Sequence, residues 1–171
     1  RLRPEQDFVV QIHYNLDRPE KIGQTDSTRV DFTISEEITR EAWFVAPDDF
    51  LLSSILEGFG MGEADLIPAG ERAYQYSFDY SGTEALLDGG FDPATAGSFE
   101  LLGVMPHMHE AGRRQWVSLR DDAENVCAME VERWDFDWQR FYFYEKPIAL
   151  TAESMLDITC EWDSSGLSEP I

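Results

Sequence analysis

Histidine, cysteine and positive charge are scarce in this chain of 171 residues. It contains three histidines, two cysteines and 13 Lys and Arg residues against 34 Asp and Glu, which gives a net charge of −21 at neutral pH. This charge repels a phosphate backbone, so we expect no nucleic-acid partner. The two cysteines, Cys127 and Cys160, allow either one disulfide in an exported protein or two buried thiols.

Long apolar runs are also missing. No stretch approaches the roughly 20 apolar residues that a membrane span requires, so we expect no membrane span in this chain. Because the sequence begins at Arg1 and carries no signal peptide, we expect it to be a processed or excised part of a longer polypeptide. We expect a secreted, periplasmic or cell-surface location.

What the sequence does have is a strand-like pattern and enough apolar residues for one core. Hydrophobic residues make up 43% and aromatic residues 13% of the chain, which suits a single domain. Helix-period stretches are short and limited to residues 50–56 and 83–87. The pattern predicts an all-β fold, an antiparallel β-sandwich of jelly-roll type. We expect about nine strands, near residues 8–15, 28–34, 40–46, 72–80, 98–109, 114–120, 125–133, 138–145 and 154–162.

Two of the three histidines stand two residues apart, in the run GVMPHMHEAG that spans residues 103–112. Alternate side chains of an extended segment point to the same side, so His107 and His109 can bind one metal ion together. The simpler alternative is a pair of exposed histidines at the rim of the sandwich. His13 stands alone on the more polar face of its strand, where a hydrogen-bonded histidine is the commoner role.

Four segments in order carry a family resemblance. They are the His13-Tyr14 strand, the LIPAGE turn at residues 66–71, the HMHEAG motif at residues 107–112, and the segment from Pro147 to Cys160. Together they resemble the C-terminal half of the copper type II, ascorbate-dependent monooxygenases, the family of peptidylglycine alpha-hydroxylating monooxygenase and dopamine beta-monooxygenase.

The resemblance implies copper ligands residue by residue. His107 and His109 match the two imidazoles of the oxygen-binding copper, whose third ligand in the family is a methionine thioether further along the chain. Two imidazoles with a soft thioether favour Cu(I). His13 matches the third histidine of the electron-transfer copper, whose other two ligands form a His-His pair in the preceding copper domain. Residues 1–20 then correspond to the end of that domain, and residues 21–171 to the C-terminal domain.

The chain departs from the family pattern at three points. It has no methionine in the Glu-Met-Cys context of the thioether ligand, and it has no His-His pair. Cys160 matches a family cysteine whose usual partner lies beside that methionine, so it is either free or paired with Cys127. Met105 stands where the peptide-amidating members have an arginine that binds the substrate carboxylate, and a thioether cannot make that bidentate contact. Peptides ending in glycine are therefore not the expected substrate.

Two functions follow as expectations. In the first, the chain is the oxygen-activating half of a monooxygenase that hydroxylates a C–H bond of a small molecule with O2 and ascorbate or a similar reductant. The isolated chain is then expected to be inactive without the preceding copper domain. In the second, it is a non-catalytic β-sandwich scaffold, or a copper-binding module that has lost activity.

Overall fold

The computed structural model describes residues 7, 9–10, 19–35, 37, 40–46, 67–120 and 125–170. The chain divides into two compact units, Arg1–Trp43 and Phe44–Ile171. The described part of the first unit contains one short 3-10 helix, η1 (Pro19–Lys21), and its other residues are mostly exposed. Of the predicted strand at residues 8–15, only residues 9 and 10 are described; both are exposed and neither is in a strand. His13 and the predicted helix at residues 50–56 lie outside the described residues.

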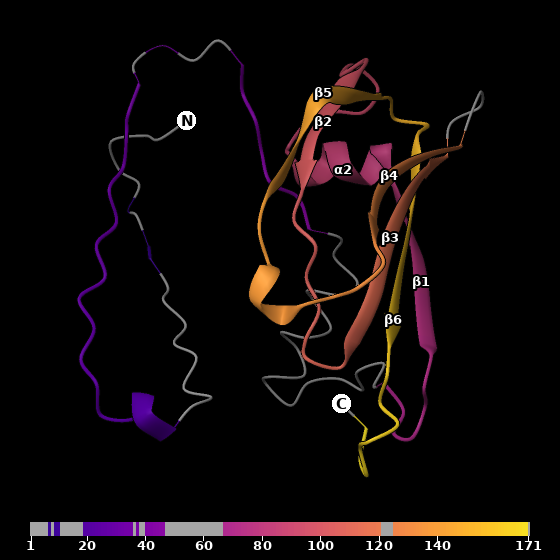
Figure 1. Cartoon of the computed structure of the whole chain (residues 1–171). Coiled ribbons are helices and arrows are strands. Elements are labelled where there is room, and N and C mark those ends of the chain that lie inside the picture. Colours follow the sequence, from indigo (N-terminus) through magenta and orange to yellow (C-terminus); the bar gives the residue numbers. More distant parts are fainter. Residues whose placement is uncertain are drawn as a thin grey trace. The chain divides into compact units, whose positions relative to one another are not determined.

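Six strands and one α-helix make up the described part of the second unit (Figure 1). The strands form two antiparallel sheets, one in the order β1-β6-β3-β4 and the other pairing β2 with β5. The predicted all-β class is therefore confirmed at this level. The elements are β1 (Tyr74–Ser81), α2 (Gly82–Asp88), β2 (Phe99–Val104), β3 (Gly112–Arg120), β4 (Asn125–Val131), the 3-10 helix η2 (Phe136–Trp138), β5 (Tyr142–Leu150) and β6 (Met155–Trp162).

Two segments with strand-like sequence belong to neither sheet. Residues 28–34 are all exposed and residues 40–46 mostly so, and neither segment is a strand, although both had been predicted to be. β-branched and aromatic residues favour a strand mainly through packing on a sheet, which these exposed residues lack. The predicted strand at residues 98–109 is also shortened, because β2 ends at Val104. Pro106 follows two residues later, and proline has no N–H to donate to a ladder.

The predicted helical stretch at residues 83–87 is confirmed as α2. Its first turn is closed by a capping box, in which the Ser81 hydroxyl accepts from the Glu84 amide and the Glu84 carboxylate accepts from the Ser81 amide. These bonds lower the pKa of the Glu84 carboxyl. Leu86 and Ala85 are buried on the inner side of the helix. No helix among the described residues is long and apolar enough to cross a membrane.

The core next to the candidate site forms around three buried residues. Met108, Cys160 and Trp162 pack together and are joined by partly buried neighbours that include Trp134. The two sheets are linked at one point by a hydrogen bond of 2.8 Å from the Tyr144 hydroxyl in β5 to the Ala128 carbonyl in β4. Cys160 is buried and Cys127 is exposed, and both are free thiols, so they do not form a disulfide with each other.

Candidate metal centre

The segment that joins β2 to β3 alternates strictly between exposed and buried residues. Met105, His107 and His109 are exposed, whereas Pro106 and Met108 are buried. This is the period-two pattern of extended backbone, even though the segment pairs with no neighbouring strand. The predicted placement of both imidazoles on one side, opposite Met108, is therefore what the structure has.

Met108 anchors the segment to the core. Its side chain is 2% exposed and packs with Cys160 and Trp162 of β6. The two histidines flank Met108 in the chain, so the contact of Met108 with β6 holds both imidazoles close to that part of the sheet. A thioether side chain suits such a position because it fills irregular apolar gaps.

A tight turn after His109 completes the placement. The Gly112 amide donates to the His109 carbonyl over 2.9 Å. A Cβ atom at Gly112 would lie 2.8 Å from Cδ1 of Trp134 and 2.9 Å from Cβ of Met108, closer than such atoms approach each other. Glycine is therefore required here by close packing.

The two imidazole rings lie close together. Their centroids are 5.4 Å apart and their planes meet at 83°. With metal–nitrogen bonds of about 2.0 Å and a ring centre about 1.1 Å beyond the nitrogen, two imidazoles on one tetrahedral metal have ring centres roughly 5 Å apart. The observed separation suits a shared metal ion.

Gln139 determines which nitrogen of His107 is free to bind a metal. Nε2 of Gln139 donates to the Phe136 carbonyl over 2.9 Å, which turns its Oε1 toward Nδ1 of His107. An amide oxygen only accepts, so Nδ1 carries the proton and donates it to Gln139. The lone pair is then on Nε2. A metal-binding histidine commonly has its second nitrogen held in this way.

The histidine pair supplies only two donors. The described residues contain no group of three His, Cys, Asp or Glu side chains that could hold a metal ion. Among the methionines, Met108 is buried, and Met129 and Met155 are half-buried in β4 and β6. Met105 is 39% exposed on the histidine side of the alternation. The other predicted ligand, His13, lies outside the described residues.

Most of the aromatic side chains at residues 134–144 are exposed, although Trp134 packs against Met108, Cys160 and Trp162. Trp138 is 56% exposed and Phe143 is 75% exposed. Three of them, Trp134, Trp138 and Tyr142, border a hollow of about 430 Å³ that Pro106, the residue before His107, also lines, and neither histidine is part of its lining. Its lining consists of Pro106, Val131, Arg133, Trp134, Asp135, Trp138 and Tyr142.

The sequence alone does not assign a role to two residues of the site, Gln139 and Gly112. Gln139 is 32 residues from His107 and lies in no recognisable motif, so only the fold reveals the contact. Gly112 belongs to the HMHEAG motif, three residues after His109, and a glycine at that position was the signal that could have indicated a close contact. No protein-family model matches the chain, and no curated protein matches it. The case for a metal at this site therefore depends on the geometry of the two imidazoles.

Proposed function

We propose that this chain is the C-terminal, oxygen-activating half of a copper-dependent monooxygenase. The observation that carries the proposal is the pair of exposed imidazoles, with ring centroids 5.4 Å apart and His107 oriented by Gln139. The reaction inserts one atom of O2 into a C–H bond and releases the other as water. Two electrons and two protons come from ascorbate or a similar reductant.

The donor set fits copper. Divalent copper lies at the top of the affinity order for nitrogen ligands, and two imidazoles leave positions open on the ion. When bound, the copper would supply the site at which O2 is activated. The residues of the chain hold the ion through Nε2 of His107 and through His109, and Gln139 keeps the His107 proton on Nδ1.

We place the substrate in the hollow that Pro106, the residue before His107, helps to line. Trp134, Trp138 and Tyr142 give it aromatic walls, which bind the apolar, C–H-bearing part of a small molecule. The exposed Met105 offers no charge to a substrate carboxylate. A substrate without a terminal carboxylate at this position is therefore preferred.

The remaining parts of the proposal concern the whole protein. They are an antiparallel sandwich of jelly-roll type, a preceding copper domain on the same polypeptide to which His13 contributes a ligand, and a secreted, periplasmic or cell-surface location. Electron transfer from that second copper would supply the reducing equivalents to the His107 and His109 site.

A second candidate is a scaffold or copper-binding module without activity. It is favoured by the finding that the described residues contain no third His, Cys, Asp or Glu near the pair. Such a module would bind copper weakly and would not reduce O2 in the presence of a reductant, even when joined to the preceding domain.

Copper titration tests the metal assignment. Cu(I) is added to the reduced chain against a chromophoric chelator, and we expect about one copper per chain. The double variant His107→Ala with His109→Ala should lose it, whereas His13→Ala should keep it. Unchanged stoichiometry in the double variant would refute the assignment. Oxygen uptake by the polypeptide extended to include the preceding domain then separates the enzyme from the inactive module.

A further inference from the structure

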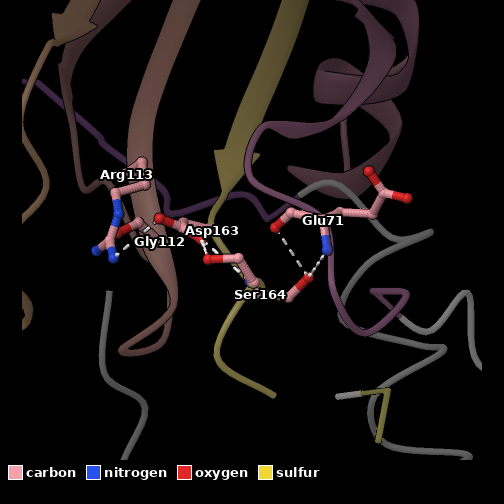
Figure 2. A network of polar contacts seen from close by, with 6 residues as sticks. Glu71, Gly112, Arg113, Asp163 and Ser164 are labelled. Carbon is pink, nitrogen blue, oxygen red and sulfur yellow. Dashed lines mark hydrogen bonds and ion pairs between the residues drawn. The ribbon is translucent and has the colours of Figure 1, made fainter. Parts of the chain in front are cut away.

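A second hollow, of about 460 Å³, shares Arg133 and Trp134 with the lining of the aromatic one. It is formed where β3 begins and where β4 and β6 end, all within the second unit. Figure 2 shows part of its frame, with Arg113 and Asp163 beside each other. Its lining consists of Arg72, Arg113, Arg114, Glu132, Arg133, Trp134, Glu161 and Asp163.

The concentration of arginine here is unusual for this chain. Four of the 13 Lys and Arg residues line one hollow, in a protein whose net charge is −21. Against them stand three carboxylates, so the lining carries a net charge of +1 (four minus three). The net negative charge of the protein repels anions, whereas the positive lining of this hollow attracts them.

A β-bulge turns two consecutive arginines toward the hollow. The pairing of β3 with β6 shifts register between Gly112 and Arg114. In regular strand geometry Arg113 and Arg114 would point to opposite faces, yet both are exposed and both line this hollow. Bulges commonly re-aim side chains next to functional sites.

Two of the three carboxylates in the lining are shared between a lining arginine and another donor. Glu161 is 3.8 Å from Arg114 but accepts a hydrogen bond of 2.7 Å from Gln75. Asp163 is 3.6 Å from Arg113 but accepts from the hydroxyl and the amide of Ser165, over 2.6 and 3.0 Å. These two bonds, more than the arginine, lower the pKa of the Asp163 carboxyl.

The arginines therefore have N–H donors available for a ligand. Neither Arg72 nor Arg133 has an ion-pair partner among the described residues. Each guanidinium carries five N–H donors in a planar fork that matches the oxygens of carboxylate and phosphate. Several such forks facing one hollow can hold an oxyanion by paired hydrogen bonds.

Backbone hydrogen bonds fix the segments that carry these arginines. Ser164 is fully buried, and its hydroxyl accepts from the Glu71 amide over 3.1 Å, which ties the segment before Arg72 to the end of β6 (Figure 2). The Trp134 amide donates to the Arg113 carbonyl over 2.7 Å, which holds Arg133 next to β3. The frame is thus built before a ligand arrives, which reduces the cost of ordering it.

We propose that this arginine hollow binds the oxyanion group of a small molecule, independently of the histidine pair. Carboxylate and phosphate share the required chemistry, and the Trp134 ring offers a wall for the rest of the ligand. Inorganic phosphate and citrate serve as the two probes.

The test is a titration of the whole chain with each probe, at constant ionic strength maintained with NaCl, followed by calorimetry. We expect saturable binding of at least one probe, and the probe that binds tighter identifies the source of the oxyanion. The double variant Arg72→Gln with Arg133→Gln should bind at least tenfold more weakly. The charge-matched control is Arg120→Gln with Lys146→Gln, at the far end of β3 and on β5, which should bind like the unchanged chain.

Two outcomes overturn the proposal. One is the absence of saturable binding of both probes to the unchanged chain. The other is equal weakening in the arginine pair and in the control pair, which would mean that only net charge matters. A circular dichroism melt of each variant shows whether it is folded, and the binding of the unchanged chain remains a test in either case.

Discussion

Replacing Gln139 with leucine should weaken copper binding without removing a ligand. The Gln139 oxygen accepts the Nδ1 proton of His107, and its amide nitrogen is held by the Phe136 carbonyl over 2.9 Å. Leucine is similar in size but accepts nothing, so the His107 ring is free to rotate and to move its proton to Nε2. Loss of such an outer hydrogen bond typically lowers metal affinity about 10- to 100-fold, which is roughly 1.4 to 2.7 kcal/mol.

The assay is competition for Cu(I) with a chromophoric chelator in a reducing buffer. Gln75→Leu is the matched control, because Gln75 donates to Glu161 on the four-stranded sheet and not to a histidine. Gln139→Glu keeps an acceptor and adds a negative charge, so it should bind copper at least as tightly as the unchanged chain. Equal affinity of Gln139→Leu and Gln75→Leu would refute the reasoning on the tautomer of His107.

Three further predictions concern stability and reactivity. Gly112→Ala places a methyl group against Trp134 and Met108, so the free energy of unfolding in urea should fall by about 1 to 3 kcal/mol. Copper affinity should fall as well. An unchanged midpoint of urea unfolding would contradict the packing argument. Burial raises the pKa of the Cys160 thiol to about 11, so at pH 8 iodoacetamide should modify the exposed Cys127 but not Cys160, as read by peptide mass spectrometry. Because this folded-state pKa lies above the ordinary value of 9.0, ionisation of the Cys160 thiol should leave the free energy of unfolding unchanged below pH 9 and lower it between pH 9 and 11. Cys160→Ala should not show this fall. Tyr144→Phe removes the bond to the Ala128 carbonyl and should cost about 1 kcal/mol, measured by urea unfolding, and no change would mean that this link between the sheets is not stabilising.

Much of the local structure near the histidines follows from the sequence. The spacing of two residues between His107 and His109 predicts that both side chains share a side, and the burial of Met108 between them agrees with it. The helical stretch at residues 83–87 is also predicted, from its helix-period pattern, and the capping box of Ser81 and Glu84 that closes it is purely local. Short-range patterns of this kind depend only on neighbours in the chain.

What the sequence does not predict depends on contacts between distant segments. Residues 28–34 have the composition of a strand but belong to neither of the two sheets, and they are exposed. The register shift between Gly112 and Arg114 and the contact of Gln139 with His107 both arise from how the strands meet. The aromatic side chains of Trp138 and Phe143 are exposed, and the local sequence does not reveal this. Periodicity indicates which residues share one face of a strand or helix, but not which other segment packs against that face.

The most direct test of the central claim is a crystal structure of the copper-loaded chain with anomalous data at the copper edge. The account predicts one copper within about 2.1 Å of Nε2 of His107 and within bonding distance of His109, with Gln139 still accepting from Nδ1. Copper bound through Nδ1 of His107, or bound away from both histidines, would contradict it.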